Sequence, residues 1–163
     1  MSIESWKAEF YPIPAEAVPE DQALNHSYRK WQGLLPENLA RHGLIQVGTM
    51  LFVDEGITDE YQIQMQQNPV FYVDGISCAL CFHHHSKSEK NDFVLCGNCP
   101  LRKVRGVPCD STLGVGDNAI SPYAAFTLRK DPRPMLDWLV IAIERRSDPA
   151  ETREGELLEG NDV

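Results

Sequence analysis

Two parts of the chain carry apolar residues at the spacing of one helix face. The stripe in residues 20–42 is broken at Gly33 and Pro36, which predicts a helix followed by a shorter one ending at Gly43. The stripe in residues 131–146 is stronger, because it runs unbroken and ends in two arginines that suit the helix dipole. The apolar members are Ala23, Leu24, Tyr28 and Trp31 in the first, and Met135, Leu136, Trp138, Leu139, Val140, Ala142 and Ile143 in the second.

Shorter runs rich in β-branched and large apolar residues predict two strands. They cover residues 43–53 (GLIQVGTMLFV) and residues 70–73 (VFYV). Between them, residues 58–60 can cap a helix that runs to about Gln67, and a further short helix is predicted from Pro122. The candidate core contacts of the helix between the strands are Tyr61, Ile63 and Met65.

The first twenty residues combine aromatic side chains with prolines. Pro12 and Pro14 hold the chain extended. We therefore expect an apolar arm that packs across the core through Trp6, Phe10 and Tyr11. In the helical segment that follows, the cations are expected on solvated faces and the histidines at the surface or at helix caps. These residues are Arg29, Lys30 and Arg41, and His26 and His42.

Together these elements predict a small α+β domain with a few helices, a short antiparallel sheet and an inserted cysteine–metal knuckle at residues 76–110. The chain has 163 residues, of which 42% are hydrophobic and 24% charged, so it can bury a core of its own. We expect a single metal-stapled domain over residues 1–146. Residues 147–163 hold six acidic residues and one basic residue, and predict an acidic disordered tail.

Charge and hydropathy restrict the partners. The net charge of −9 does not suit a sequence-blind DNA binder, whose affinity comes from neutralised phosphates. The longest apolar run, residues 138–143 (WLVIAI), is too short to span a membrane, and residues 1–10 lack the pattern of a signal peptide. The protein is therefore expected in the cytoplasm. In that reducing compartment, paired cysteines favour a metal over disulfides.

All five cysteines lie in residues 76–110, as C-x2-C, fourteen residues, C-x2-C, nine residues and a last cysteine. The two pairs offer four soft thiolates, which is the tetrahedral set that structural zinc takes and leaves no open position. A zinc staple is therefore predicted. An iron–sulfur cluster is the alternative cofactor, although the compact spacing of bacterial ferredoxins is absent. The four predicted ligands are Cys78, Cys81, Cys96 and Cys99.

Two further residues are candidate ligands. Cys109 can replace a member of the pairs, be a buried spare residue, or act as a reactive thiol. His83 lies two residues after Cys81, so a site of three cysteines and one histidine is an alternative. Otherwise His83, His84 and His85 lie together on an exposed polar loop.

The motifs of this region carry a resemblance. The strings C-x-L-C (residues 78–81), C-x-x-C-P-L (residues 96–101), G-x-x-C (residues 106–109) and Pro122-Tyr123 together resemble small uncharacterised proteins encoded by bacteriophages and prophages. The resemblance covers about residues 76–125. It implies a metal site to which Cys109 also belongs, and it brings no known activity.

The sequence is compatible with three functions. The first is a non-enzymatic zinc-stapled binding protein acting on a protein partner, which the resemblance implies to be a phage-type accessory factor acting on a host protein. The second is nucleic-acid binding through the cations that follow the second cysteine pair. The third is a zinc- or thiol-dependent enzyme, for which the chain has no H-x-E, H-E-x-x-H or G-x-S-x-G motif. The cations of the second alternative are Arg102, Lys103 and Arg105.

Overall fold

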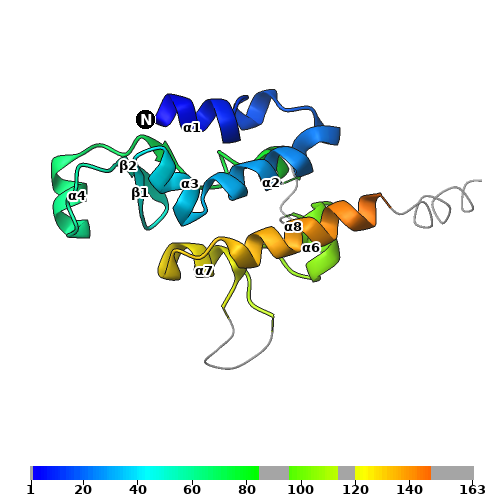
Figure 1. Cartoon of the computed structure of the whole chain (residues 1–163). Coiled ribbons are helices and arrows are strands. Elements are labelled where there is room, and N and C mark those ends of the chain that lie inside the picture. The colour runs from blue at the N-terminus through cyan, green and yellow to red at the C-terminus, as the bar shows by residue number, and fades with distance from the viewer. Residues whose placement is uncertain (1, 85–95, 114–119, 148–163) are drawn as a thin grey trace, which may run out of the picture.

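The computed structural model describes residues 2–84, 96–113 and 120–147. In these ranges the chain forms eight α-helices, two short 3-10 helices and one antiparallel sheet (Figure 1). The predicted α+β class is confirmed. The elements are α1 (Ile3–Phe10), η1 (Ala15–Ala17), η2 (Glu20–Gln22), α2 (Ala23–Gly33), α3 (Pro36–Arg41), β1 (Leu44–Val47), β2 (Met50–Val53), α4 (Glu60–Gln66), β3 (Phe71–Tyr72), α5 (Ala79–His84), α6 (Pro100–Arg105), α7 (Pro122–Arg129) and α8 (Arg133–Arg146).

Helix α2 lies at the centre of the fold, with α1, α5 and α8 packed against it (Figure 1). Its buried face meets α1 closely, because the indole N–H of the fully buried Trp6 donates to the carbonyl oxygen of Gly33 at 2.8 Å. Gly33 has no side chain to obstruct this approach. A Cβ at that position would lie 2.5 Å from Cγ of Phe10.

The N-terminal segment forms a helix over residues 3–10, which the sequence did not predict. Ser2 and Ser5 form a capping box, in which each serine oxygen accepts the backbone N–H of the other residue. This cap starts a helix before the prolines are reached. Packing of the aromatic residues into the core is confirmed, since Trp6 and Phe10 are buried and Tyr11 packs against them.

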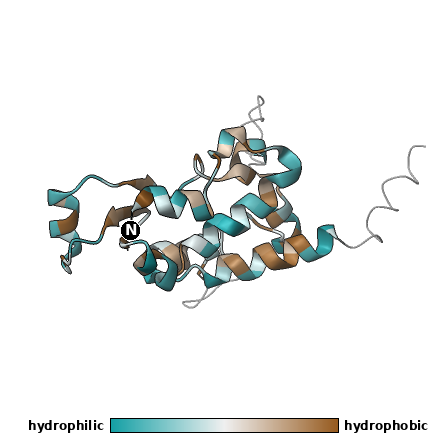
Figure 2. Ribbon diagram, turned by 45° about the horizontal axis from the view of Figure 1, so that its top comes forward, coloured by the Kyte–Doolittle hydropathy of each residue, from teal (hydrophilic) through white to brown (hydrophobic). Residues whose placement is uncertain are grey.

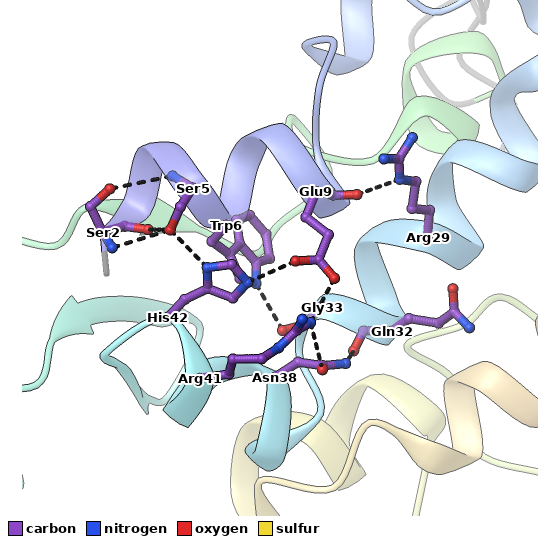
Figure 3. A network of polar contacts seen from close by, with 10 residues as sticks. All are labelled: Ser2, Ser5, Trp6, Glu9, Arg29, Gln32, Gly33, Asn38, Arg41 and His42. Carbon is purple, nitrogen blue, oxygen red and sulfur yellow. Dashed lines mark hydrogen bonds and ion pairs between the residues drawn. The ribbon is translucent and has the colours of Figure 1, made fainter.

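A polar network fastens α1 to α3 (Figure 3). His42 Nε2 donates to Glu9 at 3.0 Å, because a carboxylate can only accept, and His42 Nδ1 lies 2.8 Å from the Ser5 hydroxyl. Arg41 donates to the other Glu9 oxygen at 2.6 Å. The Ser5 oxygen also contacts the backbone N–H and carbonyl oxygen of Ser2. The chain of serine, histidine and acid therefore acts as a clamp on the helix cap.

The sheet has the order β1-β2-β3 with both pairs antiparallel. The single strand predicted over residues 43–53 is wrong, because the chain reverses at Gly48 and Thr49. Gly48 takes a positive φ of 58°, which glycine adopts without strain, and Val47 pairs with Met50 across the turn. The strand predicted at residues 70–73 is confirmed in its two central residues.

The helix predicted after the hairpin is confirmed as α4. Asp59 caps it by accepting the backbone N–H of Gln62 at 2.9 Å. Of its candidate core contacts only Ile63 is buried, whereas Tyr61 and Met65 are 73% and 68% exposed. Those two predictions are wrong, because Ile63 is the one residue of this helix buried in the small cluster with Val47 and Phe52.

Helices α7 and α8 follow the predicted positions. Ser121 caps α7 by accepting the backbone N–H of Ala124 at 3.0 Å. Along α8 hydrophobic positions alternate with hydrophilic ones, and Met135, Leu139 and Ala142 are buried (Figure 2). No helix in the described ranges is long and apolar enough to span a membrane. Beyond Ser147, the predicted tail lies outside the described residues.

Two polar side chains of α2 are buried, contrary to prediction. Lys30 is only 1% exposed, while Arg29 and Arg41 are exposed as expected. The Nε2 of the buried His26 donates to the carbonyl oxygen of Ile13 at 2.8 Å, which removes the cost of leaving that N–H without water. His42 is buried too, in the clamp that joins α1 to α3, but it is the C-cap residue of α3, so its predicted place at a helix cap is confirmed.

Candidate metal centre

A cavity of about 620 Å³ brings the cysteine-rich region together with α2 and α8. Four cysteines from three separate segments of the chain line it. The fifth, Cys99, is 8% exposed and belongs to the adjoining hydrophobic core. All five thiols are reduced. The cysteines that line the cavity are Cys78, Cys81, Cys96 and Cys109.

The first cysteine pair lies at the start of α5. A tight turn precedes it, in which Asp74 Oδ1 accepts the Ser77 N–H at 2.9 Å and Gly75 O accepts the Cys78 N–H at 3.2 Å. Because α5 begins directly after Cys78, Cys81 lies one helical turn further along the same face. Both thiols therefore point toward the same space.

The second pair encloses a turn and starts another short helix. The backbone N–H of Cys99 donates to the carbonyl oxygen of Cys96 at 3.0 Å, and Cys96 takes a positive φ of 68°. Cys99 is the N-cap residue of α6. Burial raises the pKa of its thiol, and the nearby backbone N–H groups of Arg102 and Leu101 act in the opposite direction.

The third segment places Cys109 beside the pairs. Arg105 holds this loop, since its guanidinium donates to the carbonyl oxygens of Pro108 and, at 2.9 Å, of Ser111. The carbonyl oxygen of Cys109 accepts the backbone N–H of Tyr123 at 3.2 Å, which ties the loop to α7. Cys109 therefore lines the cavity from a third segment of the chain, and remains a candidate ligand.

The thiols shift the pKa values of one another through electrostatic interactions and hydrogen bonds. A hydrogen bond from the Cys81 thiol holds the pKa of the Cys78 thiol well below its usual range, and the charge of Lys30 acts in the same direction. The proton that the pair shares stays on Cys81, whose pKa is raised by that same hydrogen bond and by burial. Burial, together with the negative charge of Cys78, raises the pKa of Cys109 to about 12. Burial also raises the pKa of Cys96.

These side chains fit a zinc ion in type and number, and they surround a common space. Four zinc–sulfur bonds of about 2.3 Å place the sulfur atoms about 3.8 Å apart, so an ion requires the thiols to close on it. In the described part of the chain, no three His, Cys, Asp or Glu side chains are already grouped closely enough to hold a metal. The zinc site and the iron–sulfur alternative therefore both stay predictions.

The histidine triplet lies apart from the cavity where it is described. The ring of His83 donates through Nε2 to the carbonyl oxygen of Val18 at 2.7 Å, and His83 does not line the cavity. Its other ring nitrogen, Nδ1, is buried and has no hydrogen-bond partner among the described residues. His84 ends α5, and His85 lies outside the described residues.

The basic residues after the second pair do not form one exposed patch. Arg105 is 5% exposed and serves the loop that carries Cys109. Lys103 is exposed and Arg102 is half-buried. The nucleic-acid alternative thus has one of its three predicted contacts in the protein interior.

Two residues of this site were missed in the sequence, although a signal was present. Ser27 and Lys30 lie on the same face of α2 as the buried Trp31, so the helical period places both side chains toward the core. The Ser27 hydroxyl lies 3.8 Å from the Cys78 sulfur. Lys30 was expected in solvent because of its charge, and Ser27 was not singled out.

Comparison of the chain with protein-family models, with curated proteins and with solved structures finds no match. The resemblance of residues 76–125 to small bacteriophage and prophage proteins therefore stays a prediction.

Proposed function

We propose that this chain is a non-enzymatic binding protein whose second half is stapled by zinc. The observation that carries the proposal is the convergence of thiols from three separate segments, all reduced, on one cavity. Four thiolates satisfy zinc fully and leave no site for an activated water, so the ion serves the fold. Its binding would contribute on the order of 10 kcal/mol to folding.

The ligands proposed are the two pairs, Cys78 with Cys81 and Cys96 with Cys99, with Cys109 competing for one position. Cys99 is favoured by its place in the second C-x2-C pair, and Cys109 by its place on the cavity wall. Zinc takes four ligands, so one of these two thiols binds it and the other stays protonated.

Cobalt(II) titration tests the ligand set, since four thiolates in a tetrahedron give intense visible and near-ultraviolet absorption. We expect Cys78→Ser and Cys81→Ser to abolish the tetrathiolate spectrum. Of Cys99→Ser and Cys109→Ser, one is expected to abolish it and the other to leave it intact. If all five single variants kept the wild-type spectrum, or wild type gave none, the proposed centre would be rejected.

The surface proposed to contact a partner is the cavity mouth. Ile76 is 83% exposed and Phe82 is 39% exposed, and both line the cavity. Three carboxylates lie beside these apolar side chains, so an apolar segment carrying basic residues is the complementary partner. The carboxylates are those of Glu16, Asp74 and Asp110. A protein partner of this kind fits the proposed accessory role in a phage-infected host.

A selection from a peptide library on the zinc-loaded protein tests this surface. The expected peptides combine apolar with basic residues, and they lose binding to Ile76→Asp and Phe82→Asp. Leu128→Asp is the matched control, because Leu128 is 77% exposed on α7 and does not line the cavity. Peptides that bind all three variants equally would show that the mouth is not the contact surface.

A further inference from the structure

Helix α2 buries a cation that no carboxylate neutralises in the described part of the chain. Lys30 is 1% exposed, and its ammonium donates to the Ser77 carbonyl oxygen at 2.9 Å and reaches the Ser77 hydroxyl at 3.4 Å. Both partners are neutral. Burying an unpaired ammonium is expensive even when it is hydrogen-bonded, so a nearby negative charge is expected.

The thiols of the cavity are candidates for that negative charge. Lys30 lines the same cavity as four of the cysteines. One turn earlier on the same helix face, the Ser27 hydroxyl lies 3.8 Å from the Cys78 sulfur. Helix α2 therefore presents a hydroxyl and an ammonium, three residues apart, to the first predicted ligand.

The net charge of a zinc–thiolate centre connects these contacts with the metal. A zinc ion bound by four thiolates carries a net charge of about −2. Groups beyond the ligands orient them and tune the metal, and mutation of such groups commonly weakens binding. A fixed positive charge beside the site offsets half of its excess.

We propose that Lys30 is the counter-ion of the thiolate centre and that Ser27 assists it by orienting Cys78. This inference rests on the proposed zinc site. It assigns a metal-supporting role to a helix that lies about fifty residues before the first cysteine. Zinc binding is thereby coupled to the packing of α5 on α2.

A purely structural role for Lys30 is the competing explanation, since its ammonium also holds the Ser77 turn. Lys30→Gln separates the two roles, because the amide can still donate to Ser77 but carries no charge. Lys30→Met removes both the donor and the charge at similar volume. The matched control is Lys103→Met, which removes an exposed positive charge four residues after Cys99.

Zinc affinity is measured by competition with a chromophoric chelator, on protein whose far-ultraviolet circular dichroism in zinc matches wild type. We expect Lys30→Gln and Lys30→Met each to weaken zinc binding about 10- to 100-fold. Lys103→Met is expected to change it less than about 3-fold, because exposed charges are screened. The second measurement is the melting temperature of the metal-free protein. For Lys30→Gln this temperature is expected to equal or exceed that of wild type.

Wild-type zinc affinity in Lys30→Gln would overturn the counter-ion role and leave the zinc site intact. An equal loss in Lys103→Met would overturn it too, because net charge alone would then explain the effect. If Lys30→Gln lost as much thermal stability in the metal-free protein as in the zinc-loaded protein, the role of Lys30 would be structural and the counter-ion role would be overturned. Absence of zinc binding in wild type would reject the centre itself.

Discussion

The contact between α1 and α2 gives a sharp prediction for Gly33→Ala. On helix propensity alone, alanine is better than glycine by up to about 1 kcal/mol. The structure predicts the opposite sign. A Cβ at this position would lie 2.5, 2.6 and 2.9 Å from Cγ, Cβ and Cδ2 of Phe10, closer than such atoms can approach.

The magnitude follows from three contributions. Overpacking a tight core costs about 1–3 kcal/mol. If α1 shifts to relieve the clash, the buried bond from Trp6 to the Gly33 carbonyl oxygen is weakened, at about 1 kcal/mol. The propensity gain offsets at most about 1 kcal/mol and is smaller at the last residue of a helix. We expect a net loss of about 1–3 kcal/mol in unfolding free energy.

Urea unfolding followed by tryptophan fluorescence measures this, with zinc present at a fixed excess. Gly75→Ala is the matched control, because its Cβ would meet only Cys81 atoms at 3.9 and 4.0 Å, which is ordinary contact. That control is expected within about 0.5 kcal/mol of wild type. In a Phe10→Ala background, the cost of Gly33→Ala should fall by about 1 kcal/mol, because two of the three close atoms are gone. A Gly33→Ala protein as stable as wild type would refute the packing described for α1.

Three further predictions follow from named contacts. The hydrogen bond from Arg41 lowers the pKa of Glu9, so the stabilisation from ionised Glu9 is present above the usual carboxyl value of about 4.3 and is lost as pH falls through the lowered value. The urea midpoints of wild type and Glu9→Gln should therefore differ at pH 7 and converge at acid pH, below the lowered pKa. Gln46→Leu removes donors to the carbonyl oxygens of Gly48 and Phe126, and should lower the unfolding free energy by about 1–3 kcal/mol in urea titrations, with an unchanged value as the contrary result. Arg105→Met releases the loop before α7 and should lower the melting temperature, whereas the exposed Lys103→Met should not.

Helix positions were predictable wherever an apolar stripe, a cap and a terminating residue agreed. For α8 the stripe alone was sufficient, and for α4 the Asp59 cap marked the start. Helix α1 was not predicted, because Pro12 and Pro14 indicated an extended chain in this region. The two serines that cap each other are common residues, and their pairing is visible only in three dimensions.

Register and burial of polar groups were less accessible to sequence reasoning. The turn at Gly48 and Thr49 lies inside a run of strand-forming residues, so one long strand and two short ones fit the same letters. Lys30 was expected in solvent because lysine usually is. Its burial depends on the Ser77 turn, which is brought to it from a distant part of the chain.

For the metal centre, the sequence indicated the donor atoms and their spacing but not their surroundings. It predicted the two pairs, and it left the position of Cys109 open. The structure adds that Cys109 lies on the cavity wall, and that Arg105 holds its loop from within. It also places His83 on the Val18 carbonyl oxygen, which spacing alone could not show.

Native mass spectrometry of the purified chain, combined with thiol counting, tests the zinc staple most directly. We expect one zinc per chain and at least four cysteines protected from alkylation while the zinc is bound. After removal of zinc by a strong chelator, all five cysteines should react and the thermal unfolding transition should shift to much lower temperature. A protein that carries no metal, or in which all five thiols react equally fast before and after chelation with no change in stability, would contradict it.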